Sequence, residues 1–330
     1  MQTWRLLNGR ALTLDRPRLM AIINCTPDSF HAPSRADSAA SARQLARQAV
    51  QDGADLLDLG AESTRPGSTR VPADEQRRRL LPVIEAIRAD TDPALAAIPI
   101  SVDTTLAEVA LAALEAGADA INDVSGATED PSMLALAAET GAGLCLMHRL
   151  APPDADRYST DYDAEPSYAP LGVVETVRRH LVARTAEALR VGVAPESILL
   201  DPGLGFGKSP AQNIELLRAT PALIAPHPEL PPPARDHAFP ILSATSRKSF
   251  VAWAQAQPHA DTPENTTPGK LPGPDGRLPA SLAFSIMHLA LGARVFRVHD
   301  VEAQGGALRA AWTLLRSPPP RDPSAPLTRG

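Results

Sequence analysis

The chain alternates short apolar runs with longer segments of helical spacing, and no other feature limits its fold as strongly. The longer segments repeat apolar residues as an amphipathic helix does, for example in residues 105–117 and 172–192, and several end in glycine. Buried runs between amphipathic helices indicate a parallel sheet, and eight such units predict a closed (β/α)₈ barrel, with a doubly wound open sheet as the alternative. The apolar runs are residues 19–24, 55–60, 98–103, 119–124, 143–148, 197–202, 239–245 and 294–300.

The remaining segments fit one domain with irregular additions. We expect residues 1–316 to form a single barrel domain. Residues 4–15 resemble a small hairpin that can plug the bottom of the barrel. Several of the 34 prolines cluster in an insert at about 255–279 and in residues 317–330. We interpret the insert as a surface excursion and the last segment as a disordered tail.

Composition excludes several classes of protein. The net charge of −6 argues against bulk binding of nucleic acid, and no apolar run is long enough to cross a membrane. The first residues lack the layout of a signal peptide, so we expect a cytoplasmic location. The two cysteines provide neither a disulfide framework nor a metal cluster, and we interpret Cys25 as a small buried apolar residue.

Polar side chains stand where nearly every predicted strand ends. Strand C-termini of a barrel all face one rim, which is where active sites of this fold are built. One such residue can be a simple strand-end cap, but a polar residue at each strand predicts a shared pocket. These residues are Asn24, Glu62, Asp103, Asn122, His148, Asp201, Lys248, Arg297 and His299.

Cationic residues and an amide gather on one side of this rim. Arg65 lies in the loop after the second strand, and Arg297 and His299 alternate along the last strand, so they point to the same side. Together with Asn24, they suit a phosphate or diphosphate. The alternative for Arg297 is an ordinary ion pair with an acid of residues 300–302.

Acceptors gather on the opposite side. Asp103, Asn122 and Asp201 end the third, fourth and sixth strands. Their oxygens suit a neutral heterocycle with several N–H groups, because a carboxylate accepts two parallel N–H bonds. A metal site at Asp103 and Asp201 is the rival interpretation, although no histidine or third carboxylate has metal-ligand spacing.

The segment LDPGLGFGKSP, residues 200–210, resembles a phosphate-binding loop but has the wrong spacing. Pro202 stands where the P-loop pattern needs its first glycine, and Lys208 stands where the dinucleotide pattern needs its third. We therefore expect the glycines to bring backbone close to a flat ligand on which Phe206 stacks. Lys208 itself is interpreted as a solvated loop lysine.

The segment SRKSF, residues 246–250, follows the seventh strand and precedes a short helical stretch. Ser249 is then near a helix N-terminus, where a carboxylate is stabilised. Lys248 can reach a carbonyl or nitrogen of a ring. The alternative is that Arg247 and Lys248 are plain surface charges.

Eight motifs together resemble the dihydropteroate synthase family. INCTPDSF, LGAESTRPG, ISVDT, INDVSG, LCLMH, LDPGLGFGK, SRKS and FRVHD stand in its order and spacing, and the resemblance covers roughly residues 19 to 315. It implies a (β/α)₈ barrel, a homodimer, and Mg²⁺ accompanying a diphosphate. The implied reaction joins 4-aminobenzoate to 7,8-dihydropterin-6-ylmethyl diphosphate and releases diphosphate, in folate biosynthesis.

The resemblance also assigns roles to residues. Asn24 resembles the contact for magnesium and diphosphate, and the other diphosphate contacts are Arg65, Arg297 and His299. Among these, Arg65 and His299 are expected to favour departure of diphosphate. The residues implied for catalysis are Asp103, Lys248, Arg65 and His299.

The two substrates imply two groups of binding residues. Four residues resemble the pterin readers, and Asp103 and Asp201 among them are expected to stabilise positive charge on the pterin. A second group resembles the walls and carboxylate anchor of an aminobenzoate pocket. The pterin readers are Asp103, Asn122, Asp201 and Lys248, and the pocket residues are Thr64, Pro66, Phe30, Phe206 and Ser249.

Residues 31–34 depart from the family. Ser-Asp-Gly-Gly commonly follows Phe30, whereas this chain has His31-Ala32-Pro33-Ser34, in a loop that normally folds over the site.

Three other functions compete with the synthase. A non-catalytic pterin-binding relative should lose the diphosphate residues, and a folate-binding methyltransferase barrel should lack SRKS with RVHD. A phosphate-binding sugar isomerase or aldolase needs a lysine or carboxylate base on a strand.

Overall fold

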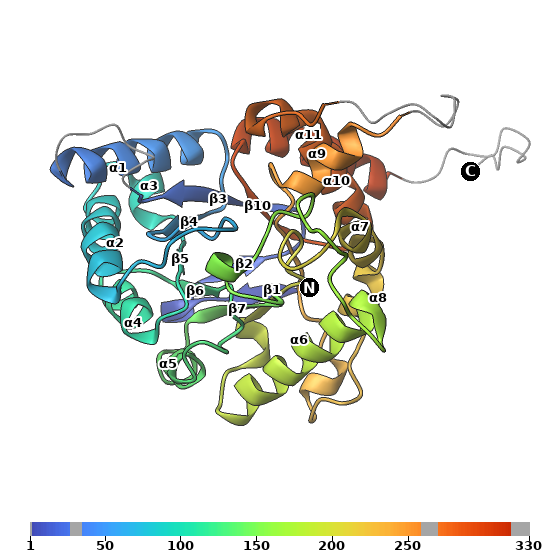
Figure 1. The fold of residues 1–330 in the computed structure, drawn as a ribbon. Coiled ribbons are helices and arrows are strands. Elements are labelled where there is room, and N and C mark those ends of the chain that lie inside the picture. The colour runs from blue at the N-terminus through green and yellow to red at the C-terminus, as the bar shows by residue number, and fades with distance from the viewer. Residues whose placement is uncertain (1, 27–34, 259–269, 318–330) are drawn as a thin grey trace, which may run out of the picture.

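The computed structural model describes residues 2–26, 35–258 and 270–317 (Figure 1). Phe30 and the changed sequence of residues 31–34 lie outside the described residues, as do residues 259–269 of the insert and the tail from residue 318. Within the described part, no helix is both long enough and apolar enough to span a membrane.

The described strands form a parallel barrel, as the alternation predicts. Eight strands are hydrogen-bonded in the order β8-β7-β6-β5-β4-β3-β10-β9. The two outer strands of that order are joined by a parallel bridge between Leu200 and Ile241, where Leu200 N donates to Pro240 O at 3.0 Å. The open-sheet alternative is therefore wrong. The strands are β3 (Arg18–Asn24), β4 (Leu56–Gly60), β5 (Ile100–Asp103), β6 (Ala120–Asp123), β7 (Gly143–Met147), β8 (Ile198–Asp201), β9 (Leu242–Ser243) and β10 (Val295–Val298).

Helices surround the barrel on its outside (Figure 1). Their apolar faces pack against the outward side chains of the strands in one large core. The helices are α1 (Arg35–Gln51), α2 (Ala73–Arg88), α3 (Pro93–Ala97), α4 (Ala107–Glu115), α5 (Ser132–Thr140), α6 (Gly172–Arg190), α7 (Pro210–Arg218), α8 (Thr220–Ile224), α9 (Ser249–Gln255), α10 (Leu278–Ala290) and α11 (Val301–Arg316).

Inside the barrel, the side chains form an apolar lower layer and a polar upper layer. Successive side chains of a strand point to opposite faces, so the residue two positions after a lower-layer residue also points inward. In β4 and β10, Leu56 and Val295 are followed in this way by Asp58 and Arg297. The upper layer comprises Asp58, Asp103, Asn122, Met147, Asp201 and Arg297, of which only Met147 is apolar. The lower layer comprises Met20, Leu56, Ala120, Cys145, Leu199, Leu242 and Val295, with Ser101 on β5 as its polar member.

The N-terminal hairpin closes the bottom of the barrel. β1 (Thr3–Arg5) and β2 (Ala11–Thr13) pair antiparallel and lie within the ring of helices (Figure 1). Trp4 is fully buried against the lower layer, and its Nε1 donates to Ser197 O at 2.9 Å. Leu7 N donates to Asp119 O at 3.0 Å, which ties the segment between β1 and β2 to the residue before β6. The prediction of a plug is confirmed.

The end of the barrel above the upper layer, where the strands have their C-termini, is called the mouth. We predict that Trp4→Ala, at the opposite end, destabilises the protein without altering the mouth. Removing a buried tryptophan leaves a cavity, so the free energy of unfolding should fall by about 3–5 kcal/mol. Urea denaturation measures this loss. Trp4→Phe keeps an aromatic ring but loses the bond to Ser197, and should cost less; an equal loss in both variants would place the energy in the hydrogen bond instead of the packing.

Candidate active site

One guanidinium joins two carboxylates in the upper layer. Arg297 Nε donates to Asp58 Oδ2 at 2.6 Å, and Arg297 Nη2 donates to Asp103 Oδ2 at 2.7 Å. Asn122 Nδ2 donates to the same oxygen of Asp58 at 3.1 Å. Arg297 therefore points into the barrel, and the predicted alternative of a pair with residues 300–302 is wrong. Arg297, from the cationic side expected from the sequence, thus contacts Asp103, from the expected acceptor side.

Asp58 is the main site residue that our sequence analysis missed. It is fully buried, and its Oδ1 has no hydrogen-bond partner among the described residues. It lies in the middle of a strand, whereas we considered only polar residues at strand ends. Its distance of two positions from Leu56 was the signal that could have revealed it.

Burial alters the protonation of Asp103. Desolvation raises its pKa to about 7, with Arg297 opposing the rise and Asp58 adding to it. The buried carboxylates of Asp58 and Asp103 share the single guanidinium of Arg297. A ligand that presents N–H groups or positive charge to this layer would be favoured.

We predict that Asp103→Asn changes how stability depends on pH. The ordinary pKa of the carboxyl is 3.8, so between about pH 4 and 7 the folded protein binds this proton more tightly than the unfolded chain. The free energy of unfolding therefore falls as pH rises through this window, and asparagine removes that fall. Urea denaturation at about pH 5 and pH 8 measures this. The free energy of unfolding of the variant, relative to that of the wild type, should be higher at pH 8 than at pH 5. A constant or shrinking difference would contradict the raised pKa.

The glycine loop after β8 orients Asp201. Gly203 N donates to Asp201 Oδ1 at 2.7 Å, and burial raises the pKa of this carboxyl while Gly203 opposes the rise. Gly203 has a φ of +68°, and a Cβ there would lie 1.8 Å from His148 O, so only glycine fits. The interpretation of Lys208 as a solvated lysine is wrong, because its side chain is fully buried beneath this loop.

Lys248 and Phe206 face one another in the mouth. Lys248 Nζ lies 3.8 Å from the centre of the Phe206 ring, within the range of a cation–π interaction. Burial lowers the pKa of Lys248 to about 8, and Asp201 opposes this change. Ser249 begins α9, a helix of seven residues, and its Oγ accepts a hydrogen bond from Ser159 N at 3.2 Å.

Arg247 anchors the turn that carries Lys248. It has a φ of +59°, in the left-handed region that strains a residue with a side chain. Its Nη2 and Nε bind the two oxygens of Asp300 at 2.5 and 3.0 Å, and Arg247 N donates to Ser281 Oγ at 3.0 Å. The alternative that Arg247 and Lys248 are plain surface charges is therefore wrong.

His299 is neutral and positioned by hydrogen bonding. Its Nδ1 lies 3.1 Å from Ser246 Oγ. Burial lowers its pKa to about 3, and the charges of Arg297, Arg247 and Arg65 lower it further. The neighbouring cations thus leave a site that favours an anion.

The remaining described candidates lie in the loop after β4 and at the end of β3. Arg65 is exposed, and Thr64 and Pro66 are half-buried in the same loop after β4. Asn24 is half-buried at the end of β3, and its side chain makes no hydrogen bond to another described residue. Cys25 is buried, and its pKa is raised to about 12 by burial, so its thiol is inert as expected.

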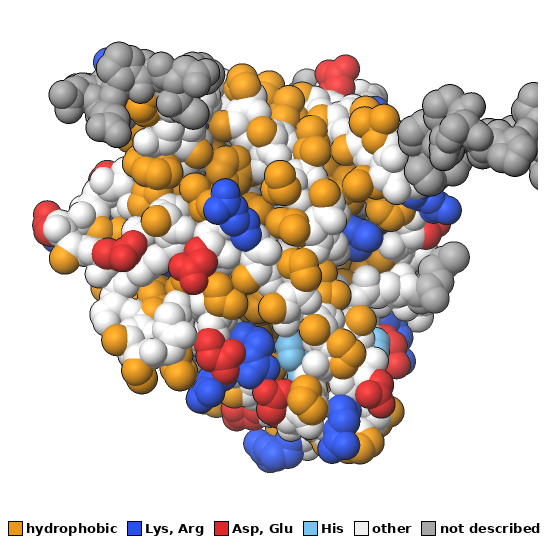
Figure 2. Space-filling model, turned by 90° about the vertical axis from the view of Figure 1, so that its right-hand side faces the viewer, with side chains coloured by type: hydrophobic (Ala, Val, Ile, Leu, Met, Phe, Trp, Pro, Cys, Tyr) orange, Lys and Arg blue, Asp and Glu red, His pale blue; other side chains and the backbone are white. Residues whose placement is uncertain are grey.

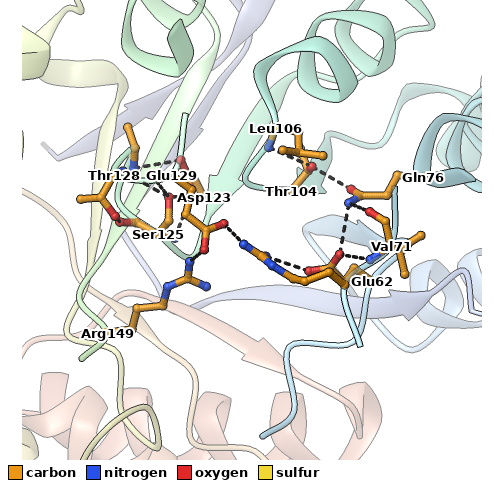
Figure 3. Close-up of polar contacts among 12 residues, drawn as sticks. Glu62, Val71, Gln76, Thr104, Leu106, Asp123, Ser125, Thr128, Glu129 and Arg149 are labelled. Carbon is orange, nitrogen blue, oxygen red and sulfur yellow. Dashed lines mark hydrogen bonds and ion pairs between the residues drawn. The ribbon is translucent and has the colours of Figure 1, made fainter. Parts of the chain in front are cut away.

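An ion-pair chain braces the loop of residues 63–72 (Figure 3). Glu62 accepts hydrogen bonds from Val71 N at 2.6 Å and from Arg70 at 3.0 Å. Arg70 also pairs with Glu129 after β6, and Glu129 pairs with Arg149 after β7. The loop that carries Thr64 and Arg65 is thereby tied to two neighbouring loops. Apart from Glu62, these residues carry no signal in the sequence that marks them as part of the site.

Known proteins match nearly the whole chain. Residues 20–299 match the family described as pterin binding enzyme. Dihydropteroate synthase from Synechocystis sp. is 38% identical over 301 residues, which cover 91% of each chain. Dihydropteroate synthase from Xanthomonas albilineans, solved with 4-aminobenzoic acid, is 36% identical with a TM-score of 0.76 and covers 96% of this chain and 100% of its own. The same enzyme in complex with 7,8-dihydropteroate is 34% identical with a TM-score of 0.72, covering 95% and 100%.

These matches agree with the motifs, the barrel and the polar residues at its mouth. The family expectation drawn from the sequence is thus confirmed: the chain belongs to the pterin-binding enzymes, as a member of the dihydropteroate synthase family.

Proposed function

We propose that this chain condenses 4-aminobenzoate with 7,8-dihydropterin-6-ylmethyl diphosphate, giving 7,8-dihydropteroate and diphosphate for folate biosynthesis. The observation that carries this proposal is the polar upper layer, in which buried acceptors of β5, β6 and β8 converge on the mouth. The related Xanthomonas enzyme was solved with 4-aminobenzoic acid and, separately, with 7,8-dihydropteroate.

The pterin ring enters the mouth above the upper layer. Asp201 and Asp103 accept its N–H groups, and Asn122 supplies a further amide. Lys248 donates to a ring carbonyl or nitrogen while its position over Phe206 is kept. Because these groups are already held by hydrogen bonds and packing, little reorganisation accompanies binding.

The diphosphate lies on the side of β3 and β10, which pair directly in the barrel. Arg65 is exposed and free to close over an anion, and His299 donates its ring N–H to a departing oxygen. Arg297 binds two carboxylates through Nε and Nη2, which leaves Nη1 for a diphosphate oxygen. These three residues favour departure of diphosphate.

Asn24 would supply a protein oxygen to a magnesium ion that binds together with the diphosphate. Its amide oxygen is a hard ligand with no partner among the described residues, and those residues contain no cluster of three metal-binding side chains. Mg²⁺ commonly takes one or two protein oxygens together with phosphate and water. With magnesium bound there, the charge of the leaving diphosphate is neutralised.

Bond formation then needs no strong base. As the C–O bond to diphosphate breaks, the exocyclic carbon becomes cationic, and Asp103 and Asp201 stabilise the charge that spreads into the pterin. The aniline nitrogen attacks this carbon, forms the C–N bond and loses a proton to solvent. Phe206, Thr64 and Pro66 form the walls of the aminobenzoate pocket, with Ser249 as carboxylate anchor and Phe30 as a wall outside the described residues.

The rival functions fit the mouth less well. A non-catalytic pterin binder would not need Arg65 and His299 together, and Arg65 is near enough to lower the pKa of His299. An aldolase would need a lysine on a strand, and Lys248 follows β9 in a turn. Incubating the protein with magnesium and both substrates tests the proposal, which requires equal amounts of dihydropteroate and diphosphate.

We predict that His299→Ala impairs turnover and spares ring binding. Loss of a hydrogen bond to a charged oxygen should lower kcat/KM for the pterin diphosphate by about tenfold or more. Affinity for 6-hydroxymethylpterin, which lacks diphosphate, should stay unchanged in calorimetry. His288→Ala is a matched control, because His288 is also buried and bonded to a serine, at 2.8 Å, but lies on α10. Equal losses for both ligands would show that His299 supports the ring or the fold.

We also propose a homodimer in the cytoplasm. Figure 2 shows hydrophobic side chains spread over the face that lies on the right in Figure 1. The helices α10 and α11 pack against each other, and they expose Ile286, Met287, Leu314 and Leu315. Such a surface favours association. Two buried free cysteines fit a reducing compartment. Sedimentation equilibrium should give twice the 34.9 kDa chain mass; a monomer at micromolar concentration would contradict the dimer.

A further inference from the structure

Lys208 is a fully buried lysine that the proposed reaction does not use. Its Nζ donates to Gly203 O at 2.8 Å and to Phe206 O at 2.9 Å, and it lies 3.1 Å from His148 Nδ1. Burial lowers the pKa of Lys208 to about 7, and Asp201 opposes this change. In its protonated form the group has three donors and no acceptor. Burial and Lys208 keep His148 neutral by lowering its pKa to about 2, so Nδ1 can accept. The three surrounding acceptors therefore match the three donors.

The loop of residues 203–207 folds around this ammonium group. Gly203, Gly205 and Gly207 all have positive φ, which turns carbonyls toward Lys208 on one side. A Cβ at Gly207 would lie 2.3 Å from the side chain of Leu150, so the loop has no space to shift in that direction. Its path is thus fixed by backbone conformation and by the buried lysine together.

The outside of the loop is braced separately. Asp156 Oδ2 accepts from Gly207 N at 3.0 Å, and Asn213 Oδ1 accepts from Gly205 N at 2.6 Å. Tyr168 Oη donates to Gly207 O at 2.8 Å. Lys208 is therefore the brace on the inner side. Its loss leaves the carbonyl of Phe206 without a donor among the described residues, whereas Gly203 O keeps the bond from Phe206 N at 3.1 Å.

What the loop presents to the mouth is the ring of Phe206. The carbonyl of Phe206 is held by Lys208, and its ring packs with Val124 and Met147 and faces Lys248. A Cβ at Gly205 would lie 2.8 Å from Lys248 Cδ, so the loop and Lys248 are in close contact. A displacement of the loop would first move the aromatic wall of the mouth.

We propose that Lys208 is a positioning residue, which holds Phe206 as the wall of the 4-aminobenzoate site from beneath the glycine loop. The inference rests on the proposed function for the identity of the second substrate. It assigns Lys208 no contact with either substrate. The pterin readers Asp103 and Asn122 lie on other strands, and Asp201 is held by Gly203 N, a backbone bond that Lys208 does not make. Loss of Lys208 should therefore affect pterin binding less than the position of Phe206.

Lys208→Met tests this role, because methionine is also a long side chain but cannot donate to the three acceptors. We expect the KM for 4-aminobenzoate to rise by about tenfold or more, equivalent to about 1.4 kcal/mol. The kcat and the affinity for 6-hydroxymethylpterin should change by less than about threefold. Lys208→Gln retains two amide donors and should restore part of the KM.

Tyr168→Phe provides a milder second variant, which removes one outer brace of the same loop. It should raise the same KM by a smaller factor and spare the pterin affinity. Asp119→Asn is the control for general destabilisation, because Asp119 binds Arg10 and Arg88 at the bottom of the barrel. It should lower the melting temperature without a selective effect on the KM for 4-aminobenzoate over the pterin affinity.

Each outcome decides the proposal. An unchanged KM for 4-aminobenzoate in a folded, active Lys208→Met variant overturns it. A pterin affinity that falls as much as the KM rises also overturns it, and assigns Lys208 to charge compensation near Asp201. Absence of dihydropteroate formation by the wild type would instead refute the proposed function, and the inference with it.

Discussion

The mouth of this barrel depends on one guanidinium shared by two buried carboxylates. Arg297 from β10 reaches across the interior to Asp58 on β4 and Asp103 on β5, at 2.6 and 2.7 Å. Removal of the arginine would leave two uncompensated charges in a site with little water, which is strongly destabilising. The pair therefore fixes the shape of the upper layer before any substrate binds.

Asp201 and the two lysines near it form a second polar group at the mouth. Asp201 is held by the backbone of the glycine loop, and the charges of Lys248 and Lys208 both oppose the rise of its pKa. In the proposed reaction, Asp103 and Asp201 together support the pterin as positive charge develops. Arg65 and His299 act at the leaving group, so the two ends of one substrate meet opposite local charges.

The alternation of apolar runs with helical segments was sufficient to predict the barrel, because buried runs between amphipathic helices form a parallel sheet and eight such units can close it. It also predicted the hairpin plug and the group of polar residues at the mouth. It did not predict Asp58, because we looked for polar residues at strand ends and Asp58 lies within a strand. Lys208 was misinterpreted for a different reason. A lysine in a glycine-rich loop usually faces water, and only the three-dimensional path of the loop shows that its carbonyls turn inward.

The central claim is that the buried carboxylates of the upper layer read the pterin ring, and Asp201→Asn tests it most directly. Asparagine keeps an acceptor for Gly203 N, so the loop should be retained, but the charged double acceptor is lost. The affinity for 6-hydroxymethylpterin, measured by calorimetry, should fall by about tenfold to a hundredfold, which corresponds to the loss of about 1.5–3 kcal/mol for hydrogen bonds to a charged group. Binding of 4-aminobenzoate to the pterin-saturated variant should change little. An unchanged pterin affinity would contradict the assignment of the upper layer as the pterin site.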